Sequence, residues 1–110
     1  MATLTPVQAA LAGTTVTMAP ASAGGDKVDG GSDVAVLVTN GSAAPVDVTI
    51  AVPGNTRAGQ PEPDVVIAVP AGASKLIGPL AEFLEDRATD SLVAISYSAT
   101  TTVTVAALKI

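Results

Sequence analysis

The residues that could do chemistry in this chain are few, and almost all of them are carboxylates. The chain contains no His and no Cys. This removes thiolate and imidazole metal ligands, Cys and Ser-His nucleophiles and the usual general base at neutral pH. The acids that cluster along the sequence are Asp26, Asp29 and Asp33, and then Glu82, Glu85 and Asp86. Unless one of these groups forms a site, the sequence predicts a protein that is not an enzyme and binds no cofactor.

The first acidic group lies in the glycine-rich stretch 21–32, which has the composition of a loop. Oxygen ligands in a flexible loop suit calcium, but an EF-hand loop needs further ligands at its third and twelfth positions. Counted from Asp26, those positions hold Val28 and Leu37. We therefore interpret the three aspartates as solvated turn residues and predict no metal site.

The second acidic group could supply the carboxylate pair of a glycosidase, which also needs aromatic side chains to hold a sugar. The aromatic residues of the chain are Phe83 and Tyr97, too few for such a groove. Leu80, Phe83 and Leu84 have helical spacing within 80–87. We expect one short helical turn there, with its acids in solvent, capping the open end of the fold.

Most of the remaining chain alternates between apolar and polar residues, the period of a β-strand with one face buried. The clearest case is Val46 to Val52, whereas Val34 to Thr39 is apolar on both faces and suits a strand covered on both sides. Turn residues between neighbouring runs predict three antiparallel hairpins. The expected partners are 34–39 with 46–52, 64–69 with 75–77, and 92–98 with 103–108.

These runs give six strands, and 4–11 and 14–18 offer up to two more, while 21–32 and 53–63 are expected to be loops. A chain of 110 residues favours one domain. We predict a single all-β domain over 1–110: a small antiparallel β-sandwich, Ig-like or jelly-roll, with six to eight strands and one short helical turn. Its expected core is formed by Val36, Val38, Val46, Val48, Ile50, Ile67, Val69, Val93, Ile95, Val103 and Val105.

Charge and hydropathy disfavour two classes of partner, nucleic acids and membranes. The net charge of −5 disfavours nucleic acid. The N-terminal region has neither the basic start of a secretory signal nor an apolar run long enough to span a bilayer, so we expect a soluble, leaderless protein without a membrane partner. Asn40-Gly41-Ser42 matches a glycosylation sequon, but we interpret it as a turn.

Short motifs of turns and strand ends follow one another in a specific order over nearly the full chain. They are Leu4-Thr5-Pro6-Val7, Ala23-Gly24-Gly25-Asp26, Val38-Thr39-Asn40-Gly41-Ser42, Val46-Asp47-Val48-Thr49-Ile50, Val69-Pro70-Ala71-Gly72, Ile77-Gly78-Pro79, Ile95-Ser96-Tyr97-Ser98 and Thr102-Val103-Thr104-Val105-Ala106-Ala107. As an ordered set they resemble a family of small proteins encoded among the head genes of tailed phages of actinobacteria. The segment 81–88 departs from the more polar link expected in that family.

The resemblance implies a virion structural protein, a minor capsid or decoration protein. Such a protein is made in the host bacterial cytoplasm and sits on the outer face of the major capsid protein shell, with no catalytic residues. Two alternatives remain: a head–tail joining or tail protein, and a cell-surface or carbohydrate-binding sandwich module. The scarcity of aromatic residues disfavours the second.

A core built mainly of Val and Ala buries little area per residue, so we also expect a homo-oligomer on the capsid lattice. A small protein attaches firmly through an extended segment or through clustering. The uncharged N-terminal segment 1–12 could add a strand to a neighbour, or it could be the first strand of the sandwich. The expected contact residues are Leu4, Pro6, Val7 and Leu11 in this segment, and Asn55 and Arg57 in the Pro/Gly loop 53–63.

Overall fold

All regular structure in this computed structural model is β-strand, over the residues that it describes: 2–31, 33–54, 57–61, 63–80 and 92–109. The strands are β1 (Ala2–Leu4), β2 (Val7–Gln8), β3 (Ala19–Pro20), β4 (Asp26–Val28), β5 (Val34–Asn40), β6 (Val46–Ile50), β7 (Val65–Val69), β8 (Ser74–Ile77), β9 (Val93–Tyr97) and β10 (Val103–Lys109). The all-β class is confirmed, with ten strands where six to eight are expected. The helical turn expected at 80–87 lies, beyond Leu80, outside the described residues.

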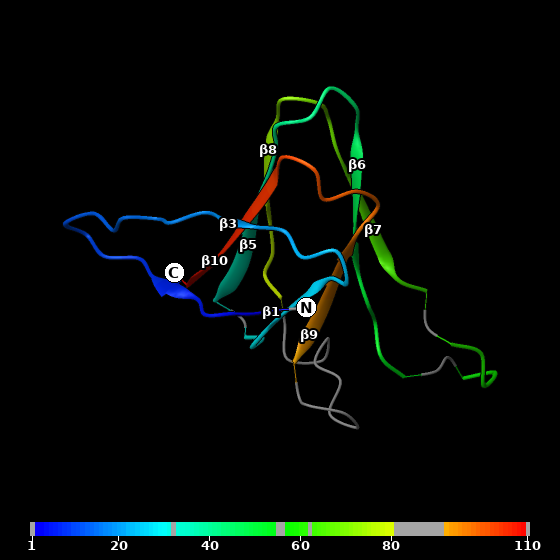
Figure 1. Cartoon of the computed structure of the whole chain (residues 1–110). Helices are drawn as coiled ribbons and strands as arrows, with labels where there is room; N and C mark the ends of the chain where they lie inside the picture. Colours follow the sequence, from blue (N-terminus) through cyan, green and yellow to red (C-terminus); the bar gives the residue numbers. More distant parts are fainter. Residues whose placement is uncertain (1, 32, 55–56, 62, 81–91, 110) are drawn as a thin grey trace.

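The strands form two sheets that lie as layers of a sandwich (Figure 1). Sheet A has the order β1-β4-β9-β6-β7, and sheet B has the order β2-β10-β5-β8, with β3 also paired to β10. The pairings are antiparallel except for β1 with β4 and β2 with β10, which are parallel. Both sheets are therefore mixed at the edge formed by the first residues of the chain, where purely antiparallel sheets are expected.

The strands from β3 to β10 pair in a nested series. β3 pairs with β10, β4 with β9, β5 with β8 and β6 with β7, and each of these pairings is antiparallel. A long hairpin that is rolled so that successive pairs fall in alternate sheets has this order, and it is the topology of a jelly roll. Of the two expected layouts, the strand order matches the jelly roll and not the Ig fold.

The three predicted hairpins are wrong. β5 lies in sheet B and β6 in sheet A, and the same separation holds for β7 and β8 and for β9 and β10. The links 41–45, 70–73 and 98–102 cross between the layers, and a few extended residues are long enough to cover the roughly 10 Å between packed sheets. A short turn-rich link fits a crossing as well as a hairpin, so the alternation pattern does not distinguish them.

The stretch 21–32, expected to be loop, contains β4, which pairs with β9 inside sheet A. One of its glycines helps to explain how a strand forms here. Gly25 has a φ of 91°, and a Cβ added there would lie 2.5 Å from the carbonyl oxygen of Ile95. Glycine at this position allows the chain to turn and approach β9 closely before the strand begins.

The predicted core is confirmed. All of its residues are buried except Ile67, which is half-buried and packs against the others. Leu80, Val28 and Ala107 also belong to this core. The alternation of each run therefore identifies the inward face correctly, although the strands pair differently from the prediction.

Of the two additional strands expected before residue 20, neither has the predicted bounds. Residues 4–11 contain the end of β1 and all of β2, which pair with different sheets, and 14–18 form no strand. Threonine-rich alternation alone does not make a strand without a neighbour to accept its hydrogen bonds.

Candidate functional site

Asp26 is not a solvated turn residue, as the sequence suggests, but is only 1 % exposed. Its Oδ2 accepts a hydrogen bond of 2.7 Å from the Tyr97 hydroxyl and one of 3.2 Å from the Ser22 backbone N–H. β4 and β9 are adjacent strands of sheet A, so this interaction joins side chains on the inner side of neighbouring strands. A buried acid held in this way is a structural element of the sandwich.

The phenol of Tyr97 responds to this environment. Burial raises the pKa of Tyr97 above its ordinary range, and the hydrogen bond to Asp26 and the charge of that carboxylate raise it further. The neutral phenol is therefore the donor, and the carboxylate is the acceptor. The arrangement holds a proton tightly and does not supply a general base.

The other acids do not gather into a site. Asp29 is exposed, Asp33 is half-buried, and Glu82, Glu85 and Asp86 lie outside the described residues. Within the described ranges, no three acidic residues lie close enough together to hold a metal ion. The same part of the chain contains no helix that could cross a membrane.

Asn40 is fully buried at the end of β5 and connects the loops at one end of the sandwich. Its side-chain Nδ2 donates to the carbonyl of Ala44 at 2.8 Å and to that of Val69 at 3.0 Å, and its Oδ1 accepts from the backbone N–H of Ser42. The backbone N–H of Gly41 donates to the carbonyl of Thr102, which a Cβ on Gly41 would approach to 2.9 Å.

Asn40 of the sequon is therefore inaccessible to glycosylation in the folded protein. The nitrogen that a glycan would modify is buried and donates two short hydrogen bonds. The turn interpretation places Asn40 correctly at the start of a link, but its role comes from its side chain. Its backbone φ is not positive, so the left-handed conformation tolerated by Asn is not used.

The expected contact residues of the N-terminal segment divide into two groups. Leu4, Pro6 and Val7 are half-buried at the edge of the sandwich, and Leu4 packs against the core. β1 pairs with β4, and β2 pairs with β10, so these residues close one side of both sheets. For residues 2–8, the structure corresponds to the second alternative, in which this segment is part of the sandwich.

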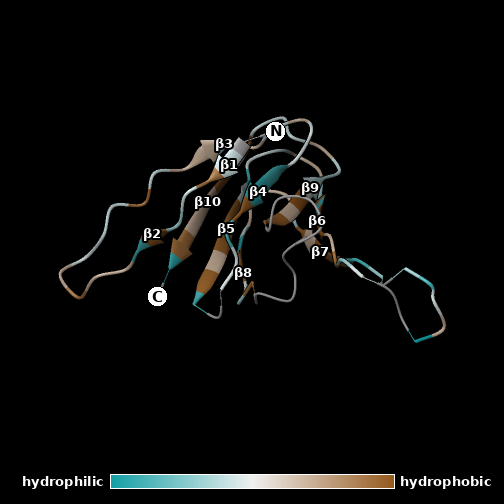
Figure 2. Ribbon diagram, turned by 90° about the horizontal axis from the view of Figure 1, so that it is seen from below, coloured by the Kyte–Doolittle hydropathy of each residue, from teal (hydrophilic) through white to brown (hydrophobic). Residues whose placement is uncertain are grey.

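Residues 9–18 behave differently, and we call them the projecting segment. In Figures 1 and 2 this segment, between β2 and β3, extends away from the sandwich on the side of sheet B. Its base is held by the backbone N–H of Ala9, which donates to the Lys109 carbonyl, and by Thr14 Oγ1, which donates to the Gln8 carbonyl at 3.1 Å. Leu11 is fully exposed.

Two shallow grooves adjoin the base of the projecting segment. One, of about 150 Å³, is lined by Val7, Ala9, Ala10, Thr14, Val16 and Leu108. The other, of about 280 Å³, lies beside β1 and β3 and is lined by residues that include Leu4, Thr17 and Ala106. The residues that line both grooves are uncharged.

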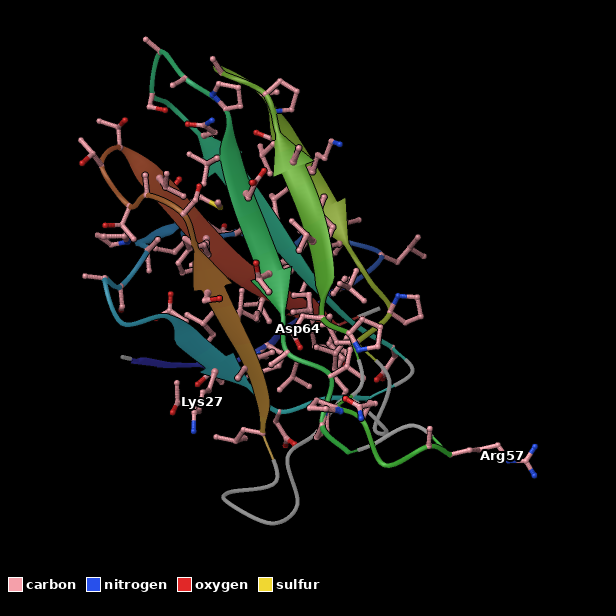
Figure 3. All side chains as sticks on the ribbon, turned by 90° about the vertical axis from the view of Figure 1, so that its right-hand side faces the viewer. Lys27, Arg57 and Asp64 are labelled. Carbon is pink, nitrogen blue, oxygen red and sulfur yellow. The ribbon has the colours of Figure 1, made fainter. Side chains whose placement is uncertain are left out.

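The Pro/Gly loop forms the opposite end of the molecule. Figure 3 shows Arg57 pointing away from the ribbon and well separated from Lys27, and Asn55 lies outside the described residues. Asp64 Oδ1 accepts the Val52 backbone N–H at 3.1 Å, which holds the base of the loop together. The structure therefore does not bring the Pro/Gly loop and the projecting segment into one site (Figure 1).

Comparison with known proteins provides no further assignment. No protein-family model, no curated protein and no solved structure matches this chain.

Proposed function

We propose that this chain is a virion structural protein, a minor capsid or decoration protein that binds the outer face of a major capsid shell and stabilises it. The ordered motifs described above support this proposal, because they resemble proteins encoded among phage head genes. The jelly-roll strand order is compatible with it, since viral capsid domains use this topology. The same topology also occurs in proteins with other functions, so the fold is a supporting observation and not the deciding one.

The observation that carries the proposal is the projecting segment. It holds Leu11 fully exposed, at the end of a segment whose base is anchored by hydrogen bonds to Gln8 and Lys109. An anchored apolar side chain can enter a pocket on a partner with little loss of backbone freedom. The segment carries no charge in a chain with a net charge of −5, so it can approach another acidic surface without repulsion.

Docking would also add stability to both partners. The buried side chains of this sandwich are mainly valines, which bury modest area. A partner that binds only the folded state stabilises it by mass action, and many copies on one lattice multiply a weak individual contact. These properties suit a protein that reinforces a shell.

Co-sedimentation tests the proposal directly. Purified protein is mixed with mature, expanded capsids from the phage that encodes the chain, and the bound amount is measured after pelleting. We expect saturable binding. Leu11→Asp should weaken it at least about tenfold, because the substitution would bury a charged carboxylate in the contact. Arg57→Ala, at the opposite end of the molecule, is the matched control and should change binding less.

Two results would contradict the proposal. Absence of saturable binding to expanded capsids would exclude a decoration role, and binding to isolated tails instead would favour the head–tail joining alternative. Deletion of residues 2–8 is not a suitable variant for this test, because β1 and β2 belong to the two sheets and their loss would affect folding.

A further inference from the structure

The central part of sheet B is apolar on both faces. On its central pair of strands, Val36, Val38 and Val105 face the core. The alternate positions face outward, and there Leu37 lies opposite Ala106 and Ala35 lies opposite Leu108. These four side chains form the centre of what we call the outer face of sheet B.

The outer face of sheet B continues onto the flanking strands. Leu76 of β8 lies beside Leu37, and Val7 of β2 lies beside Leu108. The other outward positions on β5, β8 and β10 hold Thr39, Ser74 and Thr104, so none of these described positions is charged. Sheet A differs in carrying charge: its outward positions include Lys27 and Asp47, although Val66 is also exposed there. Figure 2 shows the brown apolar colour along β5 and β10.

The four central side chains form a pattern of ridges and hollows. Ala35 and Ala106 are recessed, with 8 % and 5 % of their surface exposed, whereas Leu37 and Leu108 are half-buried. The two leucines lie on one diagonal of the β5–β10 pair, and the two alanines lie on the other. A local two-fold axis through the sheet between Val36 and Ala107 exchanges Leu37 with Leu108 and Ala35 with Ala106.

We propose that the outer face of sheet B binds the same face of a second copy of this chain. A two-fold axis that lies between the faces and runs along the strands places the leucine diagonal of one copy over the alanine diagonal of the other. Leu37 then fits over Ala106 of the second copy, and Leu108 fits over Ala35. Each copy presents the same patch to the other, as a symmetric dimer requires.

The charge and the size of the outer face of sheet B are compatible with a second copy of this chain. Two chains with a net charge of −5 repel one another, and the least repulsive contact is between surfaces without charge. β5 and β10, with seven residues each, are flanked by β8 with four residues and β2 with two. At ~3.3 Å rise per residue and ~4.8 Å between strands, the face measures at most about 20 by 23 Å. Two such faces bury at most about 900 Å² in total, below the roughly 1,200 Å² of a standard specific interface, so this face alone supports a weak dimer.

The projecting segment extends this contact. It begins at β2, on the edge of sheet B opposite β8. The two-fold axis along the strands brings the β2 edge of one copy over the β8 edge of the other. The projecting segment therefore lies alongside β8 of the second copy, where Leu76 is 59 % exposed. This dimer forms in solution and does not depend on the proposed capsid function.

The oligomeric state of the full chain tests the inference. Sedimentation equilibrium from about 1 µM to about 1 mM should show a monomer and dimer in exchange. Leu37→Glu should raise the dissociation constant at least about thirtyfold, because it places a charge in the centre of the apolar contact. The matched control is Thr49→Glu, at a half-buried outward position on an inner strand of sheet A, which should leave dimerisation unchanged. Circular dichroism of both variants reports whether they fold.

A second variant distinguishes complementary packing of the two faces from non-specific apolar association. Ala35→Leu combined with Ala106→Leu makes the face more apolar but fills both hollows. Complementary packing predicts that this variant dimerises at least about tenfold more weakly. Non-specific apolar association predicts that it dimerises more strongly. Stronger association of this variant, or a wild-type chain that stays monomeric throughout, would overturn the proposal. A monomeric wild-type chain whose binding to capsids is prevented by Leu37→Glu would show that the outer face of sheet B binds the shell protein. The dimer would then be excluded, and the proposed function would stand.

Discussion

The two sheets of this sandwich have similar inner faces and different outer faces. Inside, both contribute valines and isoleucines to one core. Outside, sheet A presents polar residues such as Asp47 and Thr49, whereas sheet B presents Leu37 and Leu108. On β6 of sheet A, the contrast between apolar and polar residues identifies the inward face. On β5 of sheet B both faces are apolar, with valines on the inward face and Ala35 and Leu37 on the outward one.

The sheets also differ in how they use their buried polar residues. Asp26 in sheet A interacts with Tyr97 on the adjacent strand and with the nearby backbone of Ser22. Asn40 in sheet B reaches across to the carbonyl of Val69 on sheet A and to the link at Ala44. Asp26 thus reinforces one sheet, and Asn40 holds the two layers together at their loops.

The largest expected effect contrasts the two sides of sheet A. Ile50→Ala should lower the free energy of unfolding by about 2–4 kcal/mol, because Ile50 is buried in the core and its truncation leaves a cavity. Thr49→Ala, one residue away on the outer face, should change it by no more than about 0.5 kcal/mol. Urea unfolding of both variants measures the difference. Equal losses would show that the strand register is wrong.

The next effect tests the bridging role of Asn40. Asn40→Ala should cost about 2–3 kcal/mol, because it removes the buried hydrogen bond to the Val69 carbonyl and the part-buried one to the Ala44 carbonyl. Ser42→Ala removes a single hydroxyl that bonds Asn40 Oδ1 and should cost no more than about 1 kcal/mol. Thermal unfolding ranks the two. A larger loss for Ser42→Ala would contradict the role assigned to Asn40.

The corresponding test in sheet A is Tyr97→Phe. At neutral pH it should cost about 1 kcal/mol, because Asp26 loses the phenol as a donor. The pKa of Tyr97 is raised in the folded state, so this group contributes its stability fully below pH ~10, the unfolded value, and loses it as the pH rises further.

The chain has a single Tyr and no Trp, so the ultraviolet absorbance of phenolate reports Tyr97 alone. We expect ionisation in the wild-type protein to begin well above pH ~10 and to accompany unfolding. In Tyr97→Phe, the alkaline loss of stability should be reduced. Ionisation of Tyr97 near pH ~10 without loss of structure would contradict its burial against Asp26.

The smallest expected effect is that of Leu37→Thr in sheet B, compared with the same replacement on the other face. At concentrations where the chain is monomeric, Leu37→Thr should change the free energy of unfolding by less than about 0.5 kcal/mol, because Leu37 faces outward. Val38→Thr places a hydroxyl in the core and should cost about 1–3 kcal/mol. Urea unfolding of dilute samples compares them, and similar losses would mean that both faces are buried in one copy.

The strand content and core of this fold could be predicted because both depend on local alternation. Val46, Val48 and Ile50 are placed on one face by their spacing alone, whichever strand lies beside them. β4 was missed because it is short, begins with an acid and follows glycines. No local feature distinguishes Asp26 in that strand from a turn aspartate, since its burial depends on Tyr97 far along the chain.

The sequence offers the candidate contact residues but does not show how the fold places them. The uncharged N-terminal segment is visible in the sequence, but the division between paired residues such as Leu4 and exposed ones such as Leu11 is not. That division depends on β4 and β10, which supply the hydrogen-bonding edges for β1 and β2. Likewise, the register of β5 with β10 and β8 decides that Leu37 lies beside Ala106 and Leu76 on one surface.

By itself, the sequence determined that the chain is a β protein, which residues form its core, and that it contains no imidazole or thiol chemistry. Only the tertiary structure decided that the short links cross between sheets, that Asn40 joins the layers, and that sheet B carries an apolar outer face. The physical reason is that alternation specifies which way each side chain points relative to its own strand. The choice of neighbouring strand is made by packing and hydrogen bonding between segments far apart in the chain.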